Sequence, residues 1–140
     1  MLDELQGVAD CLGMVFGYGQ PEDLLAIAQD ITGFDPPYIL FHEGYFNATL
    51  AQDGQGALEY THSMVLDICT PSDFADLPDK RKQYLDGLKP QLHKVYKQLT
   101  KRGEIKSASV LMGLNVTARN LDVIKLTLTI KTPAVSLCRL

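Results

Sequence analysis

The stretch YILFHEGYFNATLAQDGQGALEYTHSMVLDICT, residues 38–70, decides the fold. In its second half, residues 58–68, mainly apolar side chains stand at every second position with polar ones between them. This two-residue period is typical of a strand with one face buried. The first half, residues 38–50, is rich in aromatic and long apolar side chains, and the glycines of Asp53-Gly54-Gln55-Gly56 suit a turn between the halves. The stretch therefore predicts one β-hairpin whose arms of about a dozen residues project past a small core.

Three helices are expected around this hairpin. Apolar residues at intervals of three and four predict a helix over residues 2–12, which the glycine-rich segment 13–19 ends. A second helix begins at Pro21, followed by two acidic residues that the helix dipole favours. A third begins near Pro78, and Pro90 inside it should kink or split it, because proline lacks a donor and crowds the preceding turn.

A second hairpin follows the third helix. Residues 110–116 and 124–130 alternate apolar and polar side chains, and a turn is expected at residues 119–122. The element order is then α-α-β-β-α-β-β in a single α+β domain over residues 1–140. We expect a four-stranded, mainly antiparallel sheet with all helices packed on one face. The other face, bearing Thr, Ser and Lys, is expected to be exposed.

Composition indicates a soluble globular protein of one domain. The 140 residues give room for one core, and no run approaches the roughly 18 apolar residues of a membrane span. The acidic N-terminus lacks the basic segment of a secretion signal. Cys11, Cys69 and Cys138 stand at unrelated spacings and are expected to be reduced and mostly buried. The sequence thus predicts a cytoplasmic protein with no metal, cofactor or membrane partner.

The charges divide the chain in two. Residues 1–79 carry 14 Asp or Glu and no Lys or Arg, whereas residues 80–140 carry 13 Lys or Arg and three acidic residues. One interpretation is that the two parts attract each other within the fold. The other is that opposite faces of each subunit carry opposite signs and steer copies into a head-to-tail ring. Direct binding of nucleic acid is not expected, because the whole chain is acidic and its basic residues are not interleaved with aromatics.

Few residues suggest chemistry. If the first turn is centred on Gly54-Gln55, His42 falls opposite Asp67, and a histidine oriented by a carboxylate can act as a general base. However, no Ser or Cys stands in a nucleophile motif, and His62 lies among inward-facing apolar positions. The sequence therefore favours a protein that is not an enzyme, with no catalytic residue.

The pattern of elements resembles a family. An initial helix, a long hairpin ending in an alternating strand, a proline-started helix and a last pair of strands are similar to the tail terminator and tail-completion proteins of long-tailed bacteriophages and prophages. The resemblance covers about residues 1–133 and is one of element order. It implies a non-enzymatic structural subunit of the virion tail, assembled in the bacterial cytoplasm as a homo-oligomeric ring, possibly a hexamer. Its partners would be other tail or head-tail connector proteins.

On this interpretation the hairpin reaches an adjacent subunit and acidic surfaces meet basic ones. The residues expected at that interface are Tyr45, Phe46, Asp53, Gln55, Glu59, Lys80, Arg81, Lys82 and Lys125. Two alternatives stay open: a dimeric intracellular α+β module that holds a ligand or protein in a closed apolar pocket, and a small hydrolase or isomerase that uses His42 with Asp67 or Glu43.

Overall fold

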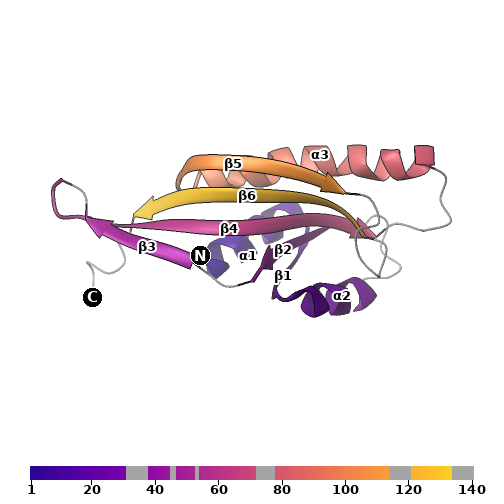
Figure 1. The fold of residues 1–140 in the computed structure, drawn as a ribbon, viewed down its shortest axis with the longest axis horizontal. Helices are drawn as coiled ribbons and strands as arrows, with labels where there is room; N and C mark the ends of the chain where they lie inside the picture. The colour runs from indigo at the N-terminus through magenta and orange to yellow at the C-terminus, as the bar shows by residue number, and fades with distance from the viewer. Residues whose placement is uncertain (31–37, 45–46, 53, 72–77, 114–120, 134–140) are drawn as a thin grey trace.

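The computed structural model describes residues 1–30, 38–44, 47–52, 54–71, 78–113 and 121–133. It is a mixed α+β fold of three helices and six strands (Figure 1). In chain order the elements are α1 (Leu2–Leu12), β1 (Val15–Gly19), α2 (Pro21–Asp30), β2 (Ile39–Glu43), β3 (Asn47–Gln52), β4 (Leu58–Pro71), α3 (Pro78–Thr100), β5 (Glu104–Gly113) and β6 (Leu121–Pro133).

All six strands share one sheet. Its order is β1-β2-β4-β6-β5, and β3 pairs with the first part of β4, on the same side as β2. The β1–β2 pair is parallel and every other pair is antiparallel. β4 is 14 residues long and pairs with β6 over nearly its whole length, so these two strands form the centre of the sheet.

Apart from β5, which pairs with β6 along both of them, the sheet has two regions. We call β1, β2, residues 64–71 of β4 and residues 121–128 of β6 the proximal half. We call β3, residues 58–63 of β4 and residues 129–133 of β6 the distal ribbon. The β3–β4 hairpin of the distal ribbon extends beyond α1 and α3 at one end of the molecule (Figure 1). The expected projecting hairpin is therefore present, with Gln52 paired to Leu58 on either side of the turn.

The prediction of four strands was wrong, because β1 was taken for the end of a helix. Glycine is abundant in this segment for a packing reason. A side chain at Gly17 would collide with Ile27 of α2 and crowd Phe41, so the glycine lets α2 lie close against the sheet. A glycine in a sequence pattern is usually taken as the end of a helix or a turn. Gly17 instead lies within strand β1, where it allows α2 to approach the sheet closely.

The first arm of the hairpin is also two strands rather than one. Gly44 adopts φ 67°, in the left-handed region, and separates β2 from β3. His42 pairs with Leu66 and Asn47 with Ser63, so four residues on one arm face two on the other. The expected His42–Asp67 register was wrong by one residue, and Phe41 is the residue opposite Asp67.

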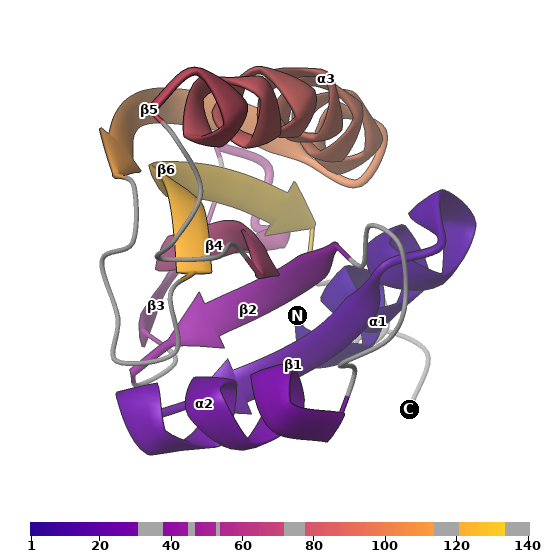
Figure 2. The same cartoon turned by 90° about the vertical axis from the view of Figure 1, so that its right-hand side faces the viewer.

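Helices cover both faces of the sheet, which corrects the expectation that all of them pack on one face. α1 and α3 cover a large core, whereas α2 covers a smaller one on the opposite face (Figure 2). Alternation along β2 explains the division, because Leu40 points into the large core while Ile39 and Phe41 point into the small one. The large core contains Leu5, Val8, Ala9, Met14, Leu40, Met64, Leu66, Ile68, Leu88, Leu92, Val95, Leu99, Ile124, Leu126, Leu128 and Ile130.

Helix α3 is continuous through Pro90, so the expected split does not occur. Pro90 is exposed, and Leu88 and Leu92 on either side of it are buried in the large core. Packing of those neighbours holds the helix together across the missing donor. The expected turn at residues 119–122 lies partly outside the described residues, and β6 already begins at Leu121.

Candidate assembly surfaces and a buried charge cluster

The distal ribbon exposes a complete edge strand. All six residues of β3 are exposed, and Leu50 is 51% exposed. β3 pairs with β4, and among the described strands none pairs with its outer edge. An unpaired edge presents a row of backbone donors and acceptors to a possible partner chain.

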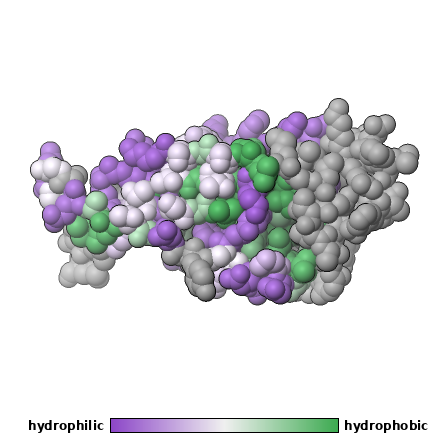
Figure 3. Space-filling view, viewed as in Figure 1, coloured by the Kyte–Doolittle hydropathy of each residue, from purple (hydrophilic) through white to green (hydrophobic). Residues whose placement is uncertain are grey.

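On the α2 side of the sheet, the part that α2 does not cover is polar. There β4, β6 and β5 carry small hydroxyl side chains, including Ser63, Thr127 and Ser109, which are exposed. Figure 3 shows this side: pale and purple colours predominate over the strands, and green is confined to small groups. The expectation of an exposed face is confirmed here for Ser and Thr side chains, whereas Lys125 and Lys131 of β6 are only partly exposed and form ion pairs. Leu111 of β5, 67% exposed, is the most exposed of the large apolar side chains described.

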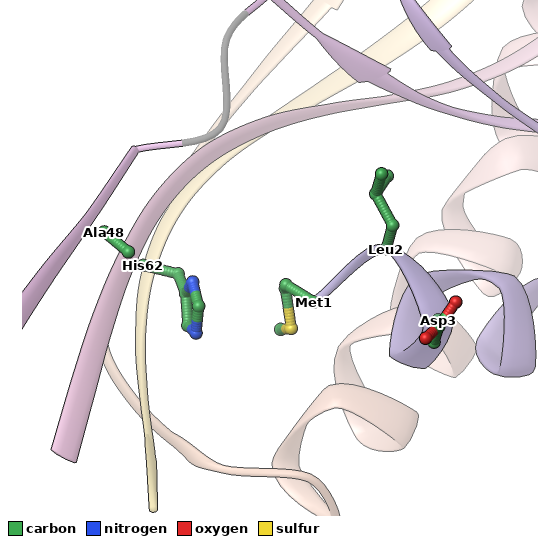
Figure 4. Close-up of a pocket in the computed structure, with 5 residues that line it drawn as sticks. All are labelled: Met1, Leu2, Asp3, Ala48 and His62. Atoms are coloured by element: carbon green, nitrogen blue, oxygen red, sulfur yellow. The ribbon is translucent and has the colours of Figure 1, made fainter. Parts of the chain in front are cut away.

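A crevice of about 410 Å³ opens between the start of α1 and the distal ribbon (Figure 4). Its lining consists of Met1, Leu2, Asp3, Ala48 and His62. The His62 ring nitrogen Nε2 lies 3.2 Å from the hydroxyl of Thr132, and burial lowers the pKa of His62 below its usual value. The crevice is open to solvent, unlike the closed apolar pocket that the ligand-binding alternative predicts.

A charge cluster lies on the α2 side of the sheet, where the small core ends. Asp67 of β4 stands opposite Lys125 of β6, and the Lys125 ammonium lies 3.7 Å from Asp67 Oδ1. Lys125 also forms an ion pair with Glu43, at the end of β2. One cation thus bridges two carboxylates from two other strands, and Asp67 is only 4% exposed.

The cluster holds a proton on a carboxylate near neutral pH. Burial raises the pKa of Asp67 to about 7, and a hydrogen bond to Glu43 and its negative charge add to this effect. Burial alone would lower the pKa of Lys125, but the two carboxylates outweigh it and raise that pKa above its usual value. Burial likewise raises the pKa of the neighbouring Cys69 thiol well above its usual value. The arrangement is that of a structural ion cluster between strands.

The two differently charged parts of the chain therefore meet within the fold at more than one place. Lys131 of β6 pairs with Glu59 of β4 at 2.7 Å, in the distal ribbon. Together with the Lys125 cluster, this pairing joins basic β6 to acidic β2 and β4. For Lys125 and Lys131, the interpretation in which opposite charges pair inside the subunit is therefore confirmed.

Other charges stay on the surface, on opposite sides of the sheet. Glu22 and Asp23 at the start of α2 are exposed, and so are Lys94 and Lys97 on α3 and Lys101 just after its end. α2 and α3 lie at opposite extremes, with the sheet between them (Figure 2). An acidic end and a basic end are thus both open to solvent.

The structure places the expected interface residues unevenly. Gln55 is exposed at the hairpin tip, whereas Glu59 and Lys125 have partners inside the chain. Tyr45, Phe46 and Asp53 lie outside the described residues, as do the side chains of Lys80, Arg81 and Lys82. The exposed edges of β3 and β5 were not foreseen. Each edge could have been recognised in the sequence as a segment of strand length without a charged residue. The alternation of apolar and polar residues, which was used to predict the strands, does not distinguish such segments.

The hypothesis of a His42–Asp67 pair was wrong. Adjacent positions of a strand point to opposite faces, so His42, paired with Leu66, lies on the α1 side, while Asp67 lies on the α2 side. His42 is buried, and burial lowers its pKa. The same alternation separates His42 from Glu43.

Two further observations concern chemistry and membranes. Within the described residues, no group of three or more His, Cys, Asp or Glu side chains could hold a metal ion. No helix in that part of the chain is long and apolar enough to cross a membrane. Cys69 is buried as expected, Cys11 is exposed contrary to expectation, and Cys138 lies outside the described residues.

Comparison with known proteins finds a distant structural likeness. No family model and no curated protein matches the chain. A chain from a solved structure described as "Virion of native gene transfer agent (GTA) particle" is similar with a TM-score of 0.43 and 16% sequence identity. The match covers 91% of this chain and 84% of that chain. This likeness is too distant to assign a family or a function.

Proposed function

We propose that the chain is a non-enzymatic structural subunit of a phage-like particle, a tail terminator or tail-completion protein that assembles into a homo-oligomeric ring. In this role it closes the tail tube and joins other tail or head-tail connector proteins. The observation that carries the proposal is the distal ribbon, which extends an exposed edge strand away from the helices.

The ribbon has the properties of an assembly element. Its β3–β4 hairpin, held by cross-strand pairing, reaches beyond the helical layers, at the cost of exposing apolar side chains such as Leu50. Projecting edges of this kind are an aggregation hazard in a solitary protein, and natural proteins usually cover or charge them. A ribbon that docks on a neighbouring copy removes the hazard.

The surface charges favour a head-to-tail arrangement. The acidic start of α2 and the basic face of α3 lie at opposite extremes of the subunit, so one copy presents to the next a surface of opposite sign. Contacts between different surfaces close into rings when the rotation allows it, whereas contacts between identical surfaces stop at a dimer.

Light scattering and negative-stain electron microscopy test the proposal. The full chain is expected to form a closed multimer larger than a dimer, whose mass does not rise further with concentration. Since part of the attraction is electrostatic, raising the salt concentration should shift the equilibrium toward smaller species. A monomer or a simple dimer over the whole concentration range, at both low and high salt, would contradict the proposal.

A further inference from the structure

We propose that copies of the chain join by strand pairing, the outer edge of β3 in one copy against the outer edge of β5 in the next. This inference rests on the proposed function and names the surface through which the ring would form. Four strands lie side by side across the sheet in the order β3-β4-β6-β5, so β3 and β5 are the two outer edges of this region.

Within the described residues, a stretch of β3 and a stretch of β5 of similar length lack the charges, prolines and bulges that usually protect a strand edge. β3, with the sequence NATLAQ, has no charge and no proline. β5 is protected only at its start, where the register shifts between Ile105 and Ser107 and where Lys106 pairs with Glu104 at 2.9 Å. Residues 107–113 carry no charge, and the side chains of residues 107–111 are exposed. Bulges and charges are the devices that prevent edge pairing, so the unprotected stretches are those where pairing is expected.

The strand directions fit a head-to-tail joint. Every neighbouring pair in the order β3-β4-β6-β5 is antiparallel, so β3 and β5 run in opposite directions. A second copy placed beside the first in the same orientation brings its β5 next to β3 as an antiparallel pair. The alternation of directions then continues unbroken from one copy to the next, without any inversion of the subunit.

β3 and residues 107–113 of β5 are offset from each other along the strand direction, and this offset is compatible with closure of a ring of copies. Asn47 lies level with Ser107, through Ser63 and Thr129, and from this row β3 and residues 107–113 extend in opposite directions. Aligning the stretches shifts each copy by about six residues, or about 20 Å at roughly 3.3 Å per residue, while four strands are about 19 Å wide. That shift tilts the strands by about 45° to the ring axis, close to the roughly 35–45° of closed sheets.

Apolar side chains add to the backbone pairing. Leu50 on β3 and Val110 and Leu111 on β5 are 51%, 46% and 67% exposed. They are three of the six large apolar side chains described as exposed, and all three lie on the two proposed edges. Leu50, paired with Tyr60, and Val110, paired with Leu126, lie on the same face of the sheet and can form a cross-strand pair across the joint. Leu111, paired with Lys125, lies on the opposite face.

Cross-linking tests the joint directly. In the full chain with Cys11→Ser and Cys138→Ser, we would introduce Thr49→Cys on β3 and Ser109→Cys on β5. Both positions are exposed, and both lie on the α2 side of the sheet, because they pair with Thr61 and Thr127. A short bismaleimide should convert the double variant into a ladder of covalent multimers. A mixture of the two single variants should give dimers only, and each single variant alone should stay monomeric on a denaturing gel.

Two results would overturn the inference. If Thr49→Cys alone gives dimers and the double variant gives no ladder, β3 pairs with β3 in a two-fold dimer. If light scattering finds a closed multimer but the double variant does not cross-link, the ring exists and uses another surface, so the proposed function stands while the strand joint fails. Absence of any multimer would instead contradict the proposed function itself.

Discussion

The two regions of the sheet differ in how they are stabilised. In the proximal half, helices cover both faces, and residues such as Leu40, Phe41 and Leu66 are at most 1% exposed. In the distal ribbon, Ile130 of β6 still reaches the large core, but β3 is attached through its pairing with β4 and all of its side chains are exposed, and the Lys131–Glu59 ion pair joins β6 to β4. The comparison teaches that burial, and with it stability, is concentrated in the proximal half, while the surface available to other chains is concentrated at the distal ribbon and along β5.

The largest expected difference between the two regions is in the loss of stability when a leucine is shortened to alanine. Leu66→Ala removes a fully buried side chain of the large core and is expected to lower the free energy of unfolding by about 2–5 kcal/mol. Leu50→Ala, at a half-exposed position of β3, should change it by no more than about 0.5 kcal/mol. Urea unfolding of both variants, followed by circular dichroism, measures the difference. Equal destabilisation would mean that the ribbon is as much a part of the core as β4.

The charge cluster should rank second. Lys125→Ala leaves Glu43 and Asp67 close together without their cation, and at pH 8 it is expected to destabilise the protein by about 1–3 kcal/mol. The loss should be smaller at pH 5, because Asp67 is then protonated. The matched control is Lys106→Ala, whose partner Glu104 is exposed and whose loss should cost less than about 0.5 kcal/mol. A similar loss of stability in both variants would show that the Lys125 cluster contributes no more to stability than an exposed ion pair.

Asp67 should make stability depend on pH. Its pKa in the folded chain is about 7, above the value of about 3.8 for a free side chain, so between these values the folded chain binds more protons than the unfolded one. Stability should therefore fall as pH rises from about 4 to 7 and not recover above that range. Asp67→Asn should remove this part of the fall and be the more stable form at pH 8.

Urea midpoints at pH 5 and pH 8 compare this variant with the natural chain. Glu104→Gln, a change at an exposed carboxylate, serves as the control and should leave the pH profile nearly unchanged. If Asp67→Asn and the natural chain lose stability in parallel as pH rises, the proton is held elsewhere.

The smallest effect on stability should accompany the largest effect on assembly. Leu50→Lys places a charge on the β3 edge, and because Leu50 is half-exposed, the free energy of unfolding should change by no more than about 0.5 kcal/mol. Light scattering should nevertheless show loss of the multimer. Gln55→Lys, at the exposed tip of the same hairpin, carries the same change of charge and should assemble normally. Loss of assembly in both variants would point to net charge, and loss in neither would exclude this edge.

Sequence patterns predicted the elements that have regular periodicity. The hairpin turn at residues 53–56, the helix beginning at Pro21 and the pairing of the last two strands follow from alternation and turn chemistry, and the structure confirms them. Strand β1 could not be foreseen in this way, because the need for glycine at residue 17 arises from contact with Ile27, a tertiary effect. His42 and Asp67 were expected to meet because a single unbroken hairpin centred on Gly54-Gln55 was assumed. The β3–β4 pairing is centred on Gln55 instead, and the two-residue excess around Gly44 then shifts β2, so His42 pairs with Leu66.

The candidate surfaces were predicted only in outline. Charge counts indicated that the two parts of the chain would attract each other, but they could not show that Lys125 and Lys131 are engaged inside the subunit while Lys94 and Lys97 of α3 face solvent. Which strand edges stay open depends on the order of strands in the sheet, and that order is set by packing between distant segments.

Hydrogen exchange as a function of protein concentration tests the central claim most directly. Exchange of the backbone amides of β3 and of residues 107–113 should slow markedly as the concentration rises and copies pair along these edges. Exchange in β2 and in residues 64–69 of β4, which are already paired within the subunit, should stay constant. Rapid exchange of β3 at every concentration, while light scattering reports a multimer, would contradict assembly through the distal ribbon.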